Sequence, residues 1–377
     1  MTPPPPGRVA IHAREPDLAY LRSALARAGR SLEADTVESE VLAGGRSGQP
    51  VFALKALRHG RPVQSFVLKM VSEASARPRA LGVGCIEANL WHSGILQSLP
   101  APLSCPALDL AWNGATGRWW LLMDDVSSGI MGRGIYDAGR LALMLRAIAA
   151  MHALYWERSD RLTNLVANLE RTTAKFTDAV VLFARGRPAA DWARQILDET
   201  PLIGAFLPKF LDVLGPRDAD FYLDLCEHRG RWVDALDAMP KTLSQGDLRR
   251  ANVAIFADRV SLFDWDVAAY APGACDLQWY WFLQFWAYPP SDGKCPEDRA
   301  PLLEGYIGAL DAALGGQLDR ALFRKSWDLA WVRVFAELGF CLADPLTGEH
   351  SADVRARVAE TCRRAVAVTR QACDDHV

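Results

Sequence analysis

Short runs of mixed apolar and polar residues, rich in Val, Leu, Phe and Trp, dominate the first 125 residues of the chain. Segments that contain Gly, Pro or Asn separate these runs, and this pattern predicts β-strands. Leucines at helical spacing predict one helix over residues 16–34, and a second helix is expected over residues 81–99. The predicted strands cover residues 37–42, 51–57, 63–71, 107–112 and 118–123.

A hairpin is predicted between the last two of these strands. Asn113 and Gly114 open the connection, and both residue types tolerate a positive φ. Residues 1–14 are proline-rich and are expected to be frayed.

Beyond about residue 130 the apolar spacing becomes helical, with one β-rich island at residues 251–266. The predicted helices cover residues 137–157, 161–185, 190–213, 217–238, 276–287, 299–313, 319–342 and 351–373. The pattern therefore predicts an α+β fold, with a small N-terminal antiparallel-sheet lobe and a larger, mainly helical C-terminal lobe. We expect an N-terminal extension and helix over residues 1–34 and a small lobe over residues 35–126. A connector would run to about residue 130, and the large lobe would cover residues 131–377.

Composition and charge exclude several classes of protein. The chain of 377 residues is 50% hydrophobic and 23% charged, which is incompatible with disorder over most of its length. A formal net charge of −3 gives no overall positive field for nucleic acid or an anionic membrane. No apolar run reaches the roughly 18 residues of a membrane helix, and the start of the sequence, with prolines at positions 3 to 6, lacks the apolar centre of a secretory signal. We therefore expect a cytoplasmic protein, a monomer or a homodimer.

The eight cysteines form no Cys-x-x-Cys pair and no cluster with histidine. This spacing argues against a zinc site or a disulfide framework and favours buried, reduced thiols.

The densest polar cluster lies in the β-rich island. Asp247 is followed five positions later by Asn252, and an apolar strand then leads to Asp264. Asp and Asn oxygens suit Mg²⁺, and a further Asp near the metal can accept a proton from an attacking hydroxyl. These are the groups that phosphoryl transfer requires.

The same cluster resembles the aminoglycoside phosphotransferase (choline kinase-like) family of the protein-kinase-like superfamily. The resemblance implies a two-lobed kinase-like fold, with Asp247 as catalytic base and with Asn252 and Asp264 as Mg²⁺ ligands. It also implies that Asp276 braces the catalytic loop. Gln245 stands where the family usually has a histidine that supports this loop.

A glycine-containing turn between the first two strands fits the nucleotide end of such a site. Glycines allow backbone N–H groups to approach phosphates without a clash from Cβ. The turn on its own could equally be a flexible hairpin. The residues implied to cover the phosphates are Gly44, Gly45, Ser47 and Gly48.

Lys69 ends the third strand among apolar residues, and a buried ammonium group requires a partner. The family role of this lysine is to hold the α- and β-phosphates. Glu87, a lone charge in an apolar stretch of the next helix, is the preferred partner, and Glu73 is the alternative.

The connector between the lobes is implied to hold the adenine. Met123, which ends an apolar strand, would lie beside the purine, and backbone groups of Asp124 and Val126 would bind its edge. An ordinary strand end followed by an acidic turn is the alternative.

The resulting hypothesis is a small-molecule O-phosphotransferase that uses ATP, or GTP, and Mg²⁺. An inactive kinase-like binding protein is the alternative, motivated by Gln245. A protein kinase is disfavoured because no Asp-Phe-Gly or Ala-Pro-Glu landmark is present.

The acceptor stays open between a cationic compound and an apolar one. Acids on the predicted helix 217–238, namely Asp220, Asp224 and Glu227, could line its pocket or form a solvated face. Arg249 could stabilise the phosphoryl group or pair with a carboxylate. His152 and the tryptophans, Trp279 included, are interpreted as core residues.

Overall fold

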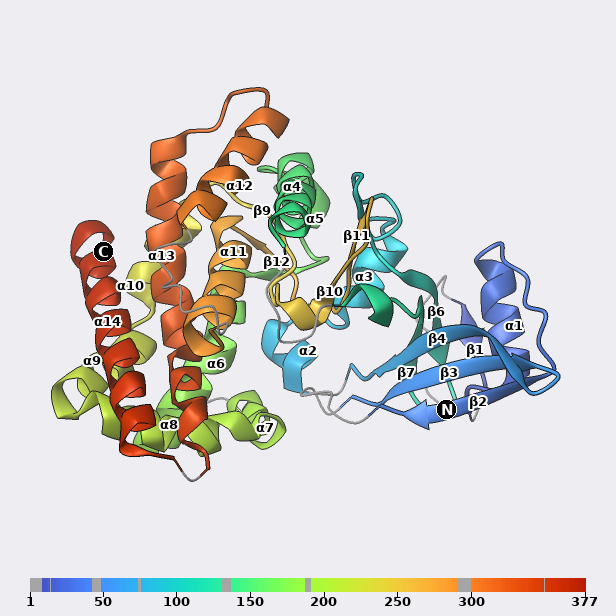
Figure 1. Ribbon diagram of the computed structural model, residues 1–377, viewed down its shortest axis with the longest axis horizontal. Coiled ribbons are helices and arrows are strands. Elements are labelled where there is room, and N and C mark those ends of the chain that lie inside the picture. Colours follow the sequence, from blue (N-terminus) through green and yellow to red (C-terminus); the bar gives the residue numbers. More distant parts are fainter. Residues whose placement is uncertain are drawn as a thin grey trace.

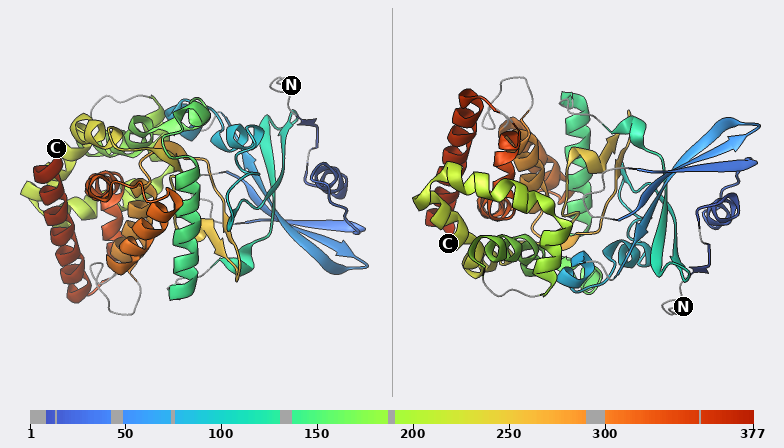
Figure 2. Two further views of the ribbon diagram at one scale, coloured as in Figure 1. Left: turned by 90° about the horizontal axis from the view of Figure 1, so that it is seen from above. Right: turned by 90° about the horizontal axis from the view of Figure 1, so that it is seen from below.

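The computed structural model describes residues 9–13, 15–42, 49–73, 76–130, 137–186, 191–289, 300–348 and 350–377. A sheet with its helix α1 lies at one end of the molecule, and a helical part that includes the C-terminus lies at the other (Figures 1 and 2). This arrangement confirms the predicted α+β fold with a small sheet-rich lobe and a larger helical one.

The N-terminal lobe is built on a six-stranded sheet in the order β1-β6-β7-β4-β3-β2. All of its pairs are antiparallel except that between β1 and β6. The short β1 lies within the segment that was expected to be frayed. The strands are β1 (Ala10–Ile11), β2 (Thr36–Val41), β3 (Val51–Arg58), β4 (Arg61–Val71), β6 (Ala107–Asn113) and β7 (Arg118–Asp124).

Helices cover both faces of this sheet. Helix α1 (Leu18–Arg27) buries Leu21 and Leu25 against one face, where Tyr20 meets the ring of Trp120 edge-on. Arg27 fixes α1 to the sheet edge through two hydrogen bonds to Asp109 of 2.9 and 2.7 Å. Helix α3 (Ile86–His92) covers the opposite face.

Both N-terminal helices are shorter than the apolar spacing predicts. Helix α1 ends at Arg27 because Gly29 follows with φ +70°. The helix expected over residues 81–99 is divided, since Gly82, Gly84 and Gly94 all adopt a positive φ. Of the predicted helix only α3 is present, and the preceding helix α2 (Ala76–Leu81) ends where the predicted helix begins.

The predicted hairpin between β6 and β7 is present, but its turn works differently. Asn113 accepts hydrogen bonds from the N–H groups of Ala115 and Thr116 through Oδ1. Gly117, rather than Asn113 or Gly114, takes the positive φ of 64°. The asparagine therefore stabilises the turn with its side chain.

The C-terminal part is mainly helical, and its helices match the predicted segments with a few divisions. Pro201 begins a new helix and Thr200 before it is not helical, which divides the helix expected over residues 190–213. Gly230 begins another and divides the helix expected over residues 217–238. The helices are α4 (Ala138–Leu154), α5 (Ser159–Leu162), α6 (Leu169–Arg185), α7 (Asp191–Glu199), α8 (Pro201–Leu214), α9 (Pro216–Glu227), α10 (Gly230–Asp237), α11 (Ala274–Trp281), α12 (Ala300–Ala313), α13 (Arg320–Leu338) and α14 (Ala352–His376).

Helix α11 continues as a π-helix over Phe282–Ala287, and α13 continues as a 3-10 helix over Gly339–Leu346. A π-turn inside a helix is rare and is often found at a functional site.

Two small sheets lie beside the helices, and the first of them holds the predicted β-island. One has the order β10-β11-β5 and the other the order β8-β12-β9. The polar cluster of the sequence lies between β9 and the end of β11. The strands are β5 (Leu103–Ser104), β8 (Ala167–Asn168), β9 (Thr242–Ser244), β10 (Val253–Ile255), β11 (Val260–Leu262) and β12 (Ala269–Ala271).

Across the part of the chain that the structure describes, no helix is long and apolar enough to cross a membrane. The seven cysteines within that part are all free thiols, in agreement with the sequence.

The packing of α1 yields a test of the N-terminal lobe. Leu21 is fully buried, so Leu21→Ala should lower the free energy of unfolding by about 2–5 kcal/mol. Urea unfolding followed by circular dichroism measures this loss. Leu154→Ala is the control, because Leu154 is 39% exposed at the end of α4; equal losses in both variants would contradict the described packing.

Candidate active site

A cavity of about 400 Å³ lies where the two lobes meet. Strands β3, β4 and β7 line it from the sheet lobe, and the segments around β10 and β11 line it from the helical part. Its lining residues include Val51, Ala53, Val67, Lys69, Met123, Asp124, Val126, Arg249, Asn252, Phe263 and Asp264.

Lys69 joins the two lobes at this cavity. Its ammonium Nζ lies 2.8 Å from Oε2 of Glu87 and 2.5 Å from Oδ1 of Asp264. Burial opposes the charge, but Asp264 and Glu87 outweigh it and raise the pKa of Lys69 well above its usual value. The lysine is therefore a fixed positive charge, and Glu87 rather than Glu73 is its partner. Glu73 instead accepts a hydrogen bond of 2.8 Å from the indole of Trp119.

Asp264 stands at the end of β11 in a backbone conformation that few residues adopt. Its φ is +62°, and Asp is among the few non-glycine residues enriched there. The neighbouring N–H of Trp265 donates to Oε1 of Glu87 at 3.1 Å. Glu87 therefore links helix α3 to the end of β11 in two ways, through Lys69 and through the N–H of Trp265.

Gly246 allows the loop that carries Asp247 to turn. Its φ is +85°, and a Cβ at this position would collide with the carbonyl oxygen of Val267. A side chain is therefore excluded for two independent reasons.

Asp276 of α11 stabilises this loop through hydrogen bonds to its carboxylate. Its fully buried carboxylate accepts hydrogen bonds from Ser244 Oγ (2.6 Å), from Gln245 N (2.8 Å) and from Gly246 N (2.8 Å). His152 Nε2 lies 3.3 Å from it. Burial opposes the charge, but the His152 contact and these hydrogen bonds hold the pKa of Asp276 below its usual value.

The side chain of Gln245 links the loop that carries Asp247 to the segment that carries Asp264. Its Nε2 donates to the carbonyl oxygens of Phe263 (3.1 Å) and Asp264 (2.6 Å), and its Oε1 accepts the N–H of Asp247 (2.9 Å). One neutral amide therefore supplies both the donor and the acceptor that hold the loop against the end of β11.

Three side chains fix the carboxylate of Asp247. Trp279 Nε1 donates to Oδ1 at 2.8 Å, and Asn252 Nδ2 donates to Oδ2 at 3.0 Å. Arg249 Nε lies 3.1 Å from the same Oδ2. The carboxylate is thus oriented before any ligand arrives.

A second cavity, of about 490 Å³, is lined by Asp247, which does not line the first. Arg249 lines both cavities, so the two adjoin at the loop that carries Asp247. The lining residues of the second cavity include Lys175, Phe176, Asp198, Glu199, Leu202, Asp247, Arg249, Trp279, Leu283 and Phe340.

The donor set at the first cavity fits a magnesium ion. Asn252 uses Nδ2 for Asp247, which leaves its oxygen Oδ1 free to coordinate a metal, and Asp264 could supply carboxylate oxygens. Among the residues described, no group of three His, Cys, Asp or Glu side chains could hold a metal by itself. Mg²⁺ commonly needs only one or two such protein ligands, because waters and substrate phosphates complete its shell.

The connector residues line the first cavity as the resemblance implies. The N–H of Asp124 donates to Pro106 O at 2.9 Å, and its carboxylate pairs with Arg30. For the N–H of Val126 we find no partner within the described chain. The turn residues Gly44, Gly45, Ser47 and Gly48 lie outside the described residues.

Sequence reasoning missed several residues of the site. Trp279 is a buried core residue, as predicted, but its indole N–H also contacts Asp247. The acids of the second cavity besides Asp247 are Asp198 and Glu199 of α7. The acids of α9 do not line this cavity; Glu227, for instance, pairs with Arg185. The spacing of Asp276 and Trp279, one helical turn apart, is the signal that could have identified the tryptophan.

No protein-family model matches the sequence, and no curated protein does. Solved structures match over most of the chain at low identity. An ethanolamine kinase of Plasmodium vivax is 14% identical with a TM-score of 0.47, and the match covers 89% of this chain and 83% of that one. An amicoumacin kinase in complex with AMP-PNP and Ca²⁺ is 14% identical with a TM-score of 0.47, covering 88% of each chain.

A spectinomycin phosphotransferase in complex with ADP and spectinomycin is 13% identical with a TM-score of 0.46, covering 90% of this chain and 94% of that one.

The stabilising role of Asp276 can be tested through the pH dependence of the free energy of unfolding. A carboxyl with a lowered pKa in the folded state stabilises the protein fully above its unfolded pKa, about 3.9, and loses this effect as the pH falls through the lower folded value. Asp276→Asn should therefore lower the free energy of unfolding at pH 7 by about 3 kcal/mol and flatten its decline in acid.

Urea unfolding between pH 7 and pH 3 measures both effects. Asp258→Asn is the control, because the side chain of Asp258 is 81% exposed. An Asp276→Asn protein with an unchanged acid profile would show that Asp276 is not the titrating brace.

Proposed function

We propose that the protein transfers the γ-phosphate of ATP, or GTP, to a hydroxyl group of a small molecule with the help of Mg²⁺. One observation carries the proposal. The ion pair between Lys69 and Asp264 lies at one cavity, and the oriented carboxylate of Asp247 faces the cavity that adjoins it.

The first cavity would hold the nucleotide. Lys69 would neutralise the α- and β-phosphates, and Asn252 and Asp264 would hold the metal. Bound Mg²⁺ supplies charge neutralisation on the phosphates. The N–H of Val126 would donate to the adenine edge and Met123 would pack beside the ring. Gly44, Gly45, Ser47 and Gly48 are proposed to cover the phosphates, as the resemblance implies.

Asp247 would orient the acceptor hydroxyl and accept its proton. As the hydroxyl oxygen forms its bond to the γ-phosphorus, the bond to the β-phosphate oxygen breaks and the nucleoside diphosphate leaves. The proton passes to Oδ1 or Oδ2 of Asp247. Trp279 and Asn252 hold that carboxylate in place, so positioning supplies much of the rate.

The second cavity favours an acceptor that carries an amine. Asp198, Glu199 and Asp247 line it together with Lys175, Arg249 and the ring of Trp279. The three carboxylates outnumber the two cations, and Lys175 already lies 4.5 Å from the centre of the Phe176 ring. Carboxylates and aromatic faces both attract ammonium groups. We therefore infer an amino alcohol, an aminoglycoside-like antibiotic or a related secondary metabolite as the acceptor.

An inactive binding protein is the second candidate, and Gln245 is its motivation. The hydrogen bonds of Gln245 argue for activity, because they hold Asp247 and Asp264 in the same loop. Gln245→Ala should then reduce turnover, whereas a merely nucleotide-binding protein would show no turnover to lose.

The catalytic role of Asp247 is tested with a panel of hydroxyl compounds. Ethanolamine, choline, aminopropanol, spectinomycin and streptomycin, each with Mg·ATP, would be scored by release of ADP. Asp247→Asn should lower kcat on any acceptor found by about 10²- to 10⁴-fold, with nucleotide affinity unchanged. The matched control is Asp258→Asn. Near-normal turnover in Asp247→Asn would exclude it as the base.

The metal site is tested without an acceptor. ATP at 100 times its Kd should stabilise the protein by about 2.7 kcal/mol in thermal unfolding. This stabilisation should require Mg²⁺ and should be lost in Asp264→Asn but kept in Asp258→Asn. An equal shift with and without Mg²⁺ would argue against a metal at Asn252 and Asp264.

A further inference from the structure

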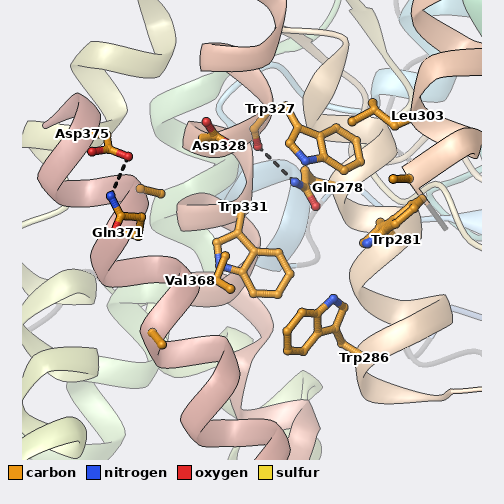
Figure 3. Close-up of a pocket in the computed structure, with 13 residues that line it drawn as sticks. Gln278, Trp281, Trp286, Leu303, Trp327, Asp328, Trp331, Val368, Gln371 and Asp375 are labelled. Atoms are coloured by element: carbon orange, nitrogen blue, oxygen red, sulfur yellow. Dashed lines mark hydrogen bonds between the residues drawn. The ribbon is translucent and has the colours of Figure 1, made fainter. Parts of the chain in front are cut away.

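A third cavity, of about 520 Å³, lies among the helices of the C-terminal part, apart from the two described above (Figure 3). None of its lining residues lines either of those cavities. Helices α11, α12, α13 and α14 and the π-helix after α11 all contribute to its wall. Its size is that of a site for one small organic molecule.

Four indole rings contribute to the wall. Trp281 and Trp327 meet edge-to-face with centroids 5.6 Å apart, and Trp286 and Trp331 lie 4.8 Å apart at 54°. Trp331 donates its Nε1 to Thr369 Oγ1 at 2.9 Å, which fixes its ring. Figure 3 shows the four rings arranged around a common space.

A buried amide group lies among these rings. Gln278 is 2% exposed, and its Nε2 donates to the backbone oxygen of Trp327 at 3.1 Å. A carbonyl oxygen can only accept, so this contact fixes which end of the amide is nitrogen. The other end, Oε1, is buried and has no hydrogen-bond partner among the described residues. A buried acceptor without a donor is costly, so a ligand N–H or O–H would relieve it.

The charges at the cavity are negative. Asp328 and Asp375 line it, and no lysine or arginine is among the lining residues. His376 contacts Asp328 at 3.1 Å, and Gln371 donates to Asp375 at 2.8 Å without neutralising it. The guanidinium of Arg364 lies 5.4 Å from the ring of Trp286 but does not line the cavity.

We propose that this cavity is a binding site for a small organic ammonium compound with an aromatic or alicyclic ring. The ring would pack among the four indoles, whose faces attract cations. The ammonium N–H would donate to Oε1 of Gln278, and the two carboxylates would favour its charge. An anionic compound with the same ring is disfavoured by the same groups.

The site stands on the opposite face of the helix that supports the catalytic loop. Gln278 and Trp281 of α11 face this cavity, whereas Trp279 of the same helix contacts Asp247. The proposal concerns binding and does not depend on the proposed phosphotransfer.

The test uses 2-phenylethylammonium as the probe and isothermal titration calorimetry as the readout, on the full chain. The wild type should bind it at submillimolar to millimolar concentration, and at least tenfold more tightly than 3-phenylpropionate, which has a comparable ring and the opposite charge. Gln278→Leu should weaken binding about tenfold. Asp375→Asn should weaken it about threefold, and less so at high salt.

Two matched variants control for the fold. Gln284 is buried in the neighbouring π-helix and Asp374 precedes Asp375, but neither lines the cavity. Gln284→Leu and Asp374→Asn should bind the probe like the wild type.

Three results would overturn the assignment. They are no binding to the wild type at 10 mM probe, equal binding of the propionate, or undiminished binding in both Gln278→Leu and Asp375→Asn. The last result would place the amine elsewhere, for instance beside Asp198 and Glu199.

Discussion

The buried ammonium group of Lys69 is the interaction on which the arrangement of the two lobes depends. A cation at this depth needs more than one carboxylate close by, because the loss of water disfavours its charge. Glu87 comes from α3 and Asp264 from the end of β11, so the sheet, its covering helix and the helical part must meet at one point. The cavity at the lobe junction is formed where they meet.

The loop that carries Asp247 is held by polar contacts rather than by regular structure. The carboxylate of Asp276 accepts hydrogen bonds from two successive backbone N–H groups, and Gln245 links the loop to the end of β11. Trp279, one turn after Asp276 on α11, contacts Asp247 directly. Helix α11 therefore holds both the start of this loop, through Asp276, and the carboxylate of Asp247, through Trp279.

The sequence was informative wherever a local physical requirement restricts the residue type. Lys69 and Glu87 could be paired from sequence because each is a lone charge in an apolar stretch. Asp247, Asn252 and Asp264 stand within one short segment, so their spacing survives in the fold. The order of the longer strands and helices followed from apolar periodicity together with the turn residues between the segments.

Other features depend on contacts between distant segments. Trp279 is of a residue type that is usually core, and only the fold shows that its indole N–H reaches a carboxylate. The walls of the second cavity come from helices whose relative placement no periodicity encodes. The helix breaks at Pro201 and Gly230 were missed because apolar spacing continues across them.

Gln245 has a consequence for the chemistry of the loop. An imidazole in its place would change its charge near pH 6.5, and the hydrogen bonds that it makes would change with it. The amide keeps the same donor and the same acceptor at every pH at which the protein is folded. The link that the Gln245 side chain makes between the N–H of Asp247 and the carbonyl oxygens of Phe263 and Asp264 therefore does not depend on a protonation of its own, and the acid dependence of the loop is left to Asp276.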